Sequence, residues 1–155
     1  MPEILGVGNA DRGDDGVGPY VLAGLAGRLP EDKLLYCDGE VSTLIGIFQR
    51  CTDLILIDAV DGPAAGLAPG EVLRLDANDP ALAKAPLHAS THALGVVEAI
   101  ALARSLGVLP AKLTVIAIAG EAFGVGEGIS APVSRAADAL IEELAAESTR
   151  SVAHA

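Results

Sequence analysis

The chain has 155 residues, a length that suits one domain with a single hydrophobic core. Hydrophobic residues make up 51% of the sequence and aromatic residues only 3%, so Ala, Val, Leu and Ile must build the core, as in sheets covered by helices on both faces. The formal net charge of −11 argues against partners such as nucleic acid and anionic membrane surfaces.

Short apolar runs bounded by Gly, Asp and Pro predict five strands, over Ile4–Val7, Leu34–Cys37, Leu54–Ile57, Glu71–Leu75 and Leu113–Ala119. Helical spacing predicts four helices, over approximately Gly18–Arg28, Thr43–Arg50, His92–Leu106 and Val133–Ala146. This order predicts an α/β fold with three layers, in which helices cover both faces of a twisted, mostly parallel five-stranded sheet. The fourth strand follows a Pro/Gly-rich segment with no intervening helix, so antiparallel pairing is an open alternative for it.

The domain organisation follows from these elements. We expect a single domain over residues 1–147, a frayed tail over residues 148–155, and a monomer. The N-terminal segment lacks a basic region followed by a long apolar stretch, and no apolar run approaches the roughly 20 residues of a membrane-spanning helix, so we expect a cytoplasmic protein. Cys37 and Cys51 fall on different predicted elements and are interpreted as buried thiols.

A glycine-rich turn after the first strand carries three carboxylates, those of Asp11, Asp14 and Asp15. Turns of this kind usually aim backbone N–H groups at an anion, so acids in the same place indicate a cation or a proton-transfer role. Two carboxylates about 4 Å apart repel by about 4 kcal/mol at an effective dielectric of 20. The turn therefore predicts a partner that offsets this repulsion.

Acidic residues also follow the other predicted parallel strands. Asp38 follows the second strand, Asp58 is predicted to end the third, and Asp61 continues the loop after it. In open α/β sheets, ligands bind beyond the carboxyl ends of the strands, where these loops converge. The sequence therefore predicts that these acids lie at one edge of the sheet: Asp14, Asp15, Asp38, Asp58 and Asp61.

His92 can supply an imidazole to the same edge, with His88 as a nearby alternative. Asp15, Asp58 and His92 together would form a set of two carboxylates and one imidazole, which suits a borderline divalent ion such as Zn, Ni or Fe. Structural alternatives stay open, because Asp58 can cap the following turn and His92 can be a hydrogen-bonded core histidine. His154 is predicted to be exposed and without a role.

Other chemistries are less well supported by the sequence. Gly6-Val7-Gly8 follows a strand, but the dinucleotide-binding pattern G-x-G-x-x-G needs glycine at position 11, which is Asp11. The sequence contains no Walker phosphate loop and no G-x-S-x-G nucleophile elbow. Cys37 has no obvious local base, which disfavours a thiol nucleophile.

Five motifs occur in a fixed order: Gly6-Val7-Gly8-Asn9, Asp14-Asp15-Gly16-Val17-Gly18, Ile57-Asp58-Ala59, Ser90-Thr91-His92-Ala93-Leu94-Gly95 and Gly128-Ile129-Ser130-Ala131-Pro132-Val133. Together they resemble the nickel–iron hydrogenase maturation endopeptidases over nearly the whole chain. The resemblance implies a twisted sheet flanked by helices. It also implies an endopeptidase that removes a short C-terminal extension from the hydrogenase large-subunit precursor once nickel is installed.

The resemblance also implies the residues of the site. Asp15, Asp58 and His92 match the metal-contacting positions of the family, and Asp38 matches a further acidic turn, which adds it to the candidate catalytic residues. Glu40 departs from the pattern, because many members have glycine there. This departure leaves the hydrogenase class open and suggests an extra carboxylate that faces the substrate peptide.

Three functional hypotheses follow from this comparison of motifs. In the first, the enzyme holds no permanent metal, and its acids and histidine complete the coordination of nickel in the precursor. In the second, the protein is a chaperone that checks the large subunit for nickel without cutting it. In the third, it is a stand-alone metallohydrolase that binds its own metal tightly.

Overall fold

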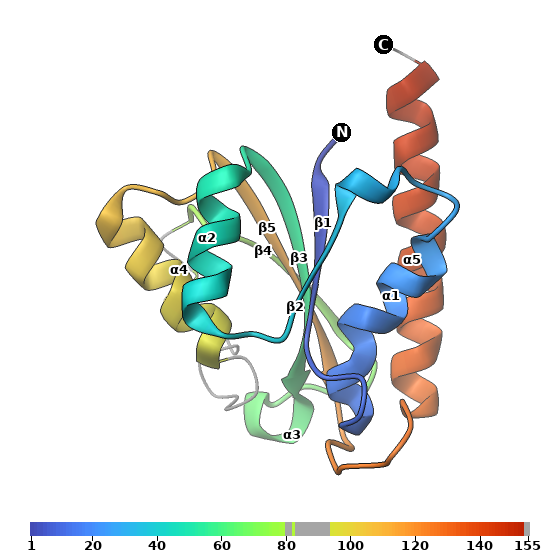
Figure 1. Cartoon of the computed structure of the whole chain (residues 1–155). Coiled ribbons are helices and arrows are strands. Elements are labelled where there is room, and N and C mark those ends of the chain that lie inside the picture. Colours follow the sequence, from blue (N-terminus) through green and yellow to red (C-terminus); the bar gives the residue numbers. More distant parts are fainter. Residues whose placement is uncertain (80–81, 83–93, 154–155) are drawn as a thin grey trace.

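The computed structural model describes residues 1–79, 82 and 94–153. Its centre is one sheet with the strand order β2-β1-β3-β5-β4 (Figure 1). The strands β1, β2, β3 and β5 run parallel, whereas β4 pairs antiparallel with β5. Their bounds are β1 (Glu3–Val7), β2 (Leu34–Cys37), β3 (Asp53–Asp61), β4 (Val72–Asp76) and β5 (Lys112–Gly120).

Helices cover both faces of the sheet, which confirms the predicted three-layer α/β fold (Figure 1). The helices α1 (Val17–Leu25) and α5 (Ala131–Ala153) pack together on one face, and α2 (Val41–Arg50) and α4 (Leu94–Leu106) pack together on the other. Three short helical turns complete the described elements: η1 (Gly13–Gly16), η2 (Glu31–Lys33) and α3 (Gly62–Ala65).

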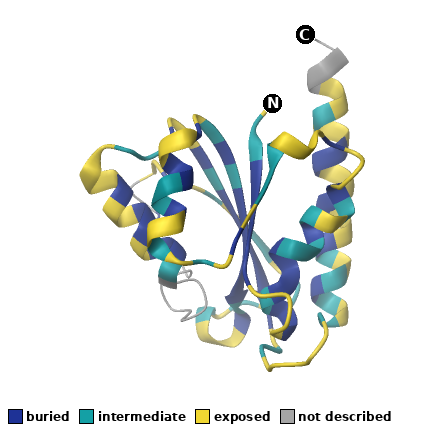
Figure 2. Ribbon diagram, in the orientation of Figure 1, coloured by how far each residue is buried: buried dark blue, intermediate teal, exposed yellow. Residues whose placement is uncertain are grey.

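Two apolar clusters fill the space between the sheet and its helix layers, and they appear as the buried centre in Figure 2. Successive residues of β3 alternate between them, because neighbouring side chains in a strand point to opposite faces. Leu56 belongs to the same cluster as Phe48, on the α2 and α4 side, while Ile57 belongs to the same cluster as Leu140, on the α1 and α5 side. Among the described residues, the buried charged side chains are those of Asp14 and Asp58.

The third strand is longer than predicted, and the expectation that Asp58 ends it is wrong. Pairing with β5 carries β3 on to Asp61, which is opposite Gly120. The pairing of β1 with β3 stops earlier, at Gly6 and Ile57. Asp58 therefore lies inside β3, one residue beyond the last residue of β3 that pairs with β1.

Two other segments also differ from the predicted elements. The short helix α3 occupies part of the Pro/Gly-rich segment that was predicted as loop. Helix α5 continues through Ala153, past the expected end of the domain at Glu147, and that boundary itself stays a prediction. Within the part of the chain that the structure describes, no helix combines the length and the apolar character needed to cross a lipid bilayer.

Candidate active site at the carboxyl edge of the sheet

A cavity of ≈ 230 Å³ lies at the carboxyl edge of the parallel strands. It brings together three of the predicted site residues: Asp15 and Asp38, from the turns after β1 and β2, and Asp58, from within β3. The complete lining among the described residues is Val7, Gly8, Asp15, Asp38, Gly39, Asp58, Gly95 and Val96.

The unequal lengths of the strands help to create this cavity. β1 ends at Val7 while its neighbour β3 continues to Asp61, so the space beyond β1 has no strand in it. The start of α4 closes the cavity from the other side. A Cβ atom on Gly95 would lie 2.8 Å from the carbonyl oxygen of Gly39, so this close approach of α4 to the turn after β2 requires glycine.

Asp58 is the most deeply buried acid of the cavity, with 2% of its surface exposed. Its Oδ1 accepts a hydrogen bond of 2.8 Å from the Ala59 N–H group. Burial raises the pKa of Asp58 well above its usual value, and the nearby charge of Asp15 raises it further, while the hydrogen bond from Ala59 acts in the opposite direction. A cation that entered the cavity would favour the charged form of Asp58 and thereby lower its pKa.

Backbone N–H groups hold the other two carboxylates. The Asn9 N–H group donates to Oδ2 of Asp15 at 2.9 Å, and the Glu40 N–H group donates to Oδ1 of Asp38 at 3.0 Å. Each carboxylate therefore has one oxygen fixed by the turn beside it and keeps a second oxygen for other contacts. Carboxylates held in this way can contact a metal ion or accept a proton.

Glu40, which departs from the family pattern, is engaged by the first turn of α2. Its carboxylate accepts hydrogen bonds from the hydroxyl of Ser42 and, at 2.8 Å, from the hydroxyl of Thr43. These two bonds lower the pKa of Glu40. Glu40 is not among the residues that line the cavity. The extra carboxylate suggested by the sequence is instead hydrogen-bonded to the start of α2.

Asp14, which was predicted to lie at the same edge, does not line the cavity. Its side chain is fully buried and is hydrogen-bonded to the loop between β5 and α5. Asp61 accepts a hydrogen bond of 3.3 Å from the Ala64 N–H group and caps α3. The adjacent acids Asp14 and Asp15 thus have different environments, which their neighbouring positions in the sequence did not reveal.

The three histidines, His88, His92 and His154, lie outside the described residues. Among the residues that are described, no three His, Cys, Asp or Glu side chains are grouped so that they could hold a metal ion. The carboxylates of Asp15 and Asp58 are therefore the part of the predicted ligand set that can be located. The contribution of His92 stays a prediction.

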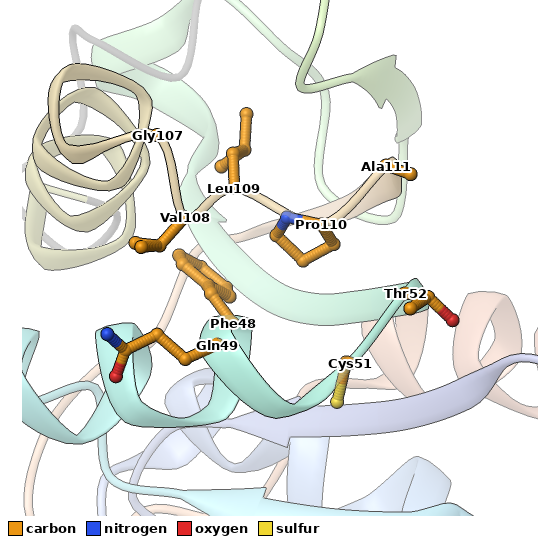
Figure 3. A pocket seen from close by; sticks show the side chains of 9 residues that line it. All are labelled: Phe48, Gln49, Cys51, Thr52, Gly107, Val108, Leu109, Pro110 and Ala111. Carbon is orange, nitrogen blue, oxygen red and sulfur yellow. The ribbon is translucent and has the colours of Figure 1, made fainter.

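A larger cavity of ≈ 450 Å³ lies at the opposite edge, before the first residues of β3 and β5 (Figure 3). Side chains such as Phe48 and Leu109 line it, together with Cys51. The Cys51 thiol donates a hydrogen bond to Glu3, and burial and this bond raise the pKa of the thiol to about 11. Both cysteines are free and buried, as predicted, and neither is a favourable nucleophile.

The sequence of the chain matches the model of a known protein family. The family model described as "Hydrogenase maturation protease" matches residues 39–147. The chain belongs to the hydrogenase maturation protease family. The members of this family are endopeptidases, so the protein is a hydrolase. The matched region includes Asp58 and position 92, whereas Asp15 and Asp38 precede it.

Individual relatives extend the similarity to the N-terminal motif. The chain is 29% identical over 148 residues to the hydrogenase 2 maturation protease of Escherichia coli, an alignment that covers 92% of this chain and 87% of the relative. It is 37% identical over 80 residues to the hydrogenase 3 maturation protease of the same organism, over 49% of each chain.

Solved structures of maturation proteases share the fold. The hydrogenase maturating endopeptidase HybD from E. coli superimposes with a TM-score of 0.75 at 25% identity, covering 97% of this chain and 94% of that protein. The hydrogenase maturation protease HybD from Thermococcus kodakarensis has the same fold, with a TM-score of 0.66 at 23% identity over 93% of this chain and 97% of that one.

Proposed function

We propose that this maturation protease removes the C-terminal extension from the large-subunit precursor of a nickel–iron hydrogenase after nickel insertion. The nickel belongs to the substrate, and Asp15, Asp58 and His92 contact it during recognition. The observation that carries this proposal is the pair formed by Asp15 and buried Asp58 in one small cavity. The charge of Asp15 contributes to the raised pKa of Asp58, and a divalent cation is the partner that would offset this repulsion.

Chain connectivity supports the assignment of His92. Gly95 lines the cavity, and His92 precedes it by three residues in the sequence. Three residues of chain span at most about 11 Å, so chain length allows an imidazole at position 92 to reach this cavity. A mixed set of oxygen and nitrogen ligands suits nickel.

The cavity also provides a group for proton transfer. Nickel held by the precursor would orient the scissile peptide bond and polarise its carbonyl. Water then attacks the carbonyl carbon, its proton passes to a carboxylate of the cavity, and the peptide nitrogen leaves with a proton. Asp38 is the carboxylate that remains for this role when Asp15 and Asp58 contact the metal.

The test is incubation of the purified protein with nickel-loaded and nickel-free precursor, followed by intact-mass analysis. We expect loss of a C-terminal peptide from the loaded form alone. Cleavage of both forms would contradict recognition through nickel. Complex formation without cleavage would instead support a nickel-checking chaperone, and tight binding of nickel or zinc by the protein alone would support a stand-alone metallohydrolase.

The role of His92 is tested by His92→Ala, with His154→Ala as the matched control. We expect His92→Ala to abolish processing of the loaded precursor and to leave the thermal unfolding of the protein unchanged. His154→Ala should process the precursor as the wild type does. Normal processing by a folded His92→Ala variant would remove His92 from the site.

A further inference from the structure

Asp14 binds the loop over residues 121–130 with both oxygens of its carboxylate. Oδ1 accepts a hydrogen bond of 2.7 Å from the Ser130 N–H group. Oδ2 accepts three more, from the Ser130 hydroxyl at 2.9 Å, the Glu121 N–H group at 2.9 Å and the Ala122 N–H group at 3.1 Å. Four hydrogen bonds compensate for the complete burial of this carboxylate, and they join segments more than 100 residues apart in the sequence.

Backbone hydrogen bonds join the same two segments. The Asp14 N–H group donates to the Ala122 carbonyl at 2.6 Å, and the Gly13 N–H group donates to the Glu127 carbonyl at 3.1 Å. In the other direction, the Gly126 N–H group donates to the Asp11 carbonyl at 2.9 Å. The turn over residues 11–14 and the loop over residues 121–130 are therefore held together by both backbone and side-chain bonds.

The short helix η1 is confined on two sides by close contacts. A Cβ atom on Gly8, after β1, would lie 2.0 Å from the carbonyl oxygen of Asp15. A Cβ atom on Gly120, at the end of β5, would lie 2.7 Å from the Cβ atom of Asp14. Because β3 lies between β1 and β5 in the sheet, η1 spans the end of β3 and contacts it. A shift of Asp14 relative to Gly120 would therefore move the backbone of Asp15.

We propose that Asp14 is the positioning residue of the site, which holds the adjacent Asp15 in the cavity by fastening η1 to the loop between β5 and α5. The proposal rests on the proposed function, in which Asp15 contacts nickel. Asp14 itself touches neither metal nor peptide, because its carboxylate is engaged away from the cavity. Its effect on catalysis is to fix where the oxygens of Asp15 lie.

Two substitutions weaken this anchor to different extents. Asp14→Asn replaces one carboxylate oxygen by an amide NH₂ group, which cannot accept the hydrogen bonds now made to it. Ser130→Ala removes only the hydroxyl bond and keeps the backbone bond to Oδ1. Asp138→Asn is the matched control, because it removes an acid that accepts a hydrogen bond from Tyr20 on the surface between α1 and α5.

The first measurement is the affinity of each variant for nickel-loaded and for nickel-free precursor. We expect Asp14→Asn to reduce the preference for the loaded form as much as Asp15→Asn does, and the double variant to show no further loss. A loss of folded protein alone would weaken both affinities equally and leave the preference unchanged. For kcat, a misplacement of about 1 Å predicts a decrease of about 100-fold for Asp14→Asn, with a smaller decrease for Ser130→Ala.

The second measurement needs no precursor and therefore separates this proposal from the proposed function. The Asn9 N–H group donates to Asp15, so its hydrogen exchange, followed by NMR, reports where that carboxylate lies. We expect faster exchange at Asn9 in Asp14→Asn and Ser130→Ala, with unchanged exchange at core residues such as Leu56. Asp138→Asn should leave Asn9 unchanged.

The outcomes separate the two proposals. Unchanged exchange at Asn9 in the folded variants, or a preference for nickel that survives Asp14→Asn but not Asp15→Asn, would overturn the positioning role. If the wild type shows no preference for loaded precursor, the proposed function fails, and the exchange at Asn9 alone decides the role of Asp14. If Asp14→Asn does not fold, Ser130→Ala carries both measurements.

Discussion

The two edges of the sheet carry cavities of opposite character. The cavity at the carboxyl edge has a volume of ≈ 230 Å³ and three carboxylates in its lining. The cavity at the amino edge is larger, at ≈ 450 Å³, but its titratable side chain is a buried thiol whose pKa is raised to about 11. Cavity size alone would therefore favour the amino edge, whereas the carboxylates favour the carboxyl edge.

The difference between the edges follows from how the chain leaves each strand. At the carboxyl edge, β1 ends before its neighbour β3, and the turns that follow β1 and β2 bring acids over the open space. At the amino edge, the ends of α2 and α4 lead into β3 and β5 with apolar residues such as Phe48 and Leu109. The carboxyl edge thus places several carboxylates where a ligand can contact them.

Substitutions at the two edges should differ most in how fast the precursor is processed. In the proposed function Asp15 contacts nickel, and losing even a supporting partner of a metal ligand costs about 10- to 100-fold, so Asp15→Asn at the carboxyl edge should reduce the rate by at least about 100-fold. Cys51→Ala at the amino edge should leave the rate unchanged. The measurement is a time course of precursor cleavage at a temperature where both variants are folded. Equal losses in the two variants would contradict the assignment of the site.

Thiol chemistry provides the second contrast between the edges. At pH 8, a pKa of about 11 leaves Cys51 with about 100-fold less thiolate than the ordinary pKa of 9.0 would. Because the thiolate is the form that reacts, alkylation of Cys51 by iodoacetamide should be at least about 100-fold slower in the folded protein than in the unfolded one. Intact-mass analysis over time measures the rate. Because Cys37 is also a free thiol, the measurement uses a Cys37→Ala variant, and rapid labelling of this folded variant would show that reagent reaches Cys51 at the amino edge.

Two glycines with positive φ permit a matched comparison of stability. Gly39 lines the carboxyl-edge cavity with φ of 104°, and Gly107 lines the amino-edge cavity with φ of 72°. Alanine at either position should cost roughly 1–2 kcal/mol through backbone strain. Thermal unfolding should show similar decreases in Tm, while only Gly39→Ala should slow processing. An equally slow Gly107→Ala variant would mean that stability, rather than the site, limits the rate.

The smallest expected effect is a gain in stability from Asp58→Asn. Because the folded-state pKa of Asp58 lies above the ordinary value of 3.8, the stability of the wild type falls as pH rises from that value through the folded-state pKa. The variant lacks this loss, so its Tm should exceed that of the wild type at pH 7. Below pH 3.8 the difference should vanish, and Asp138→Asn should show no gain at either pH.

Much of the carboxyl edge could be predicted from local sequence patterns. Apolar runs identified all five strands within a few residues. Because Asp15 follows β1 and Asp38 follows β2, the sequence placed both acids at one edge of the sheet. The end of β3 could not be predicted, because its last residues are held by pairing with β5 and carry no break in their own sequence. The sequence did locate Asp58 at this edge, but only the sheet register places it inside the strand.

The roles of the adjacent acids separate what the sequence determined from what the tertiary structure decided. The order of apolar runs and turn residues determined the α/β fold, and the ordered motifs indicated the family to which the chain belongs. Nothing local distinguishes Asp14 from Asp15, since both occupy the same four-residue turn. Their roles differ because the partners of Asp14 are contributed by residues 121–130, and only folding brings that loop to the turn.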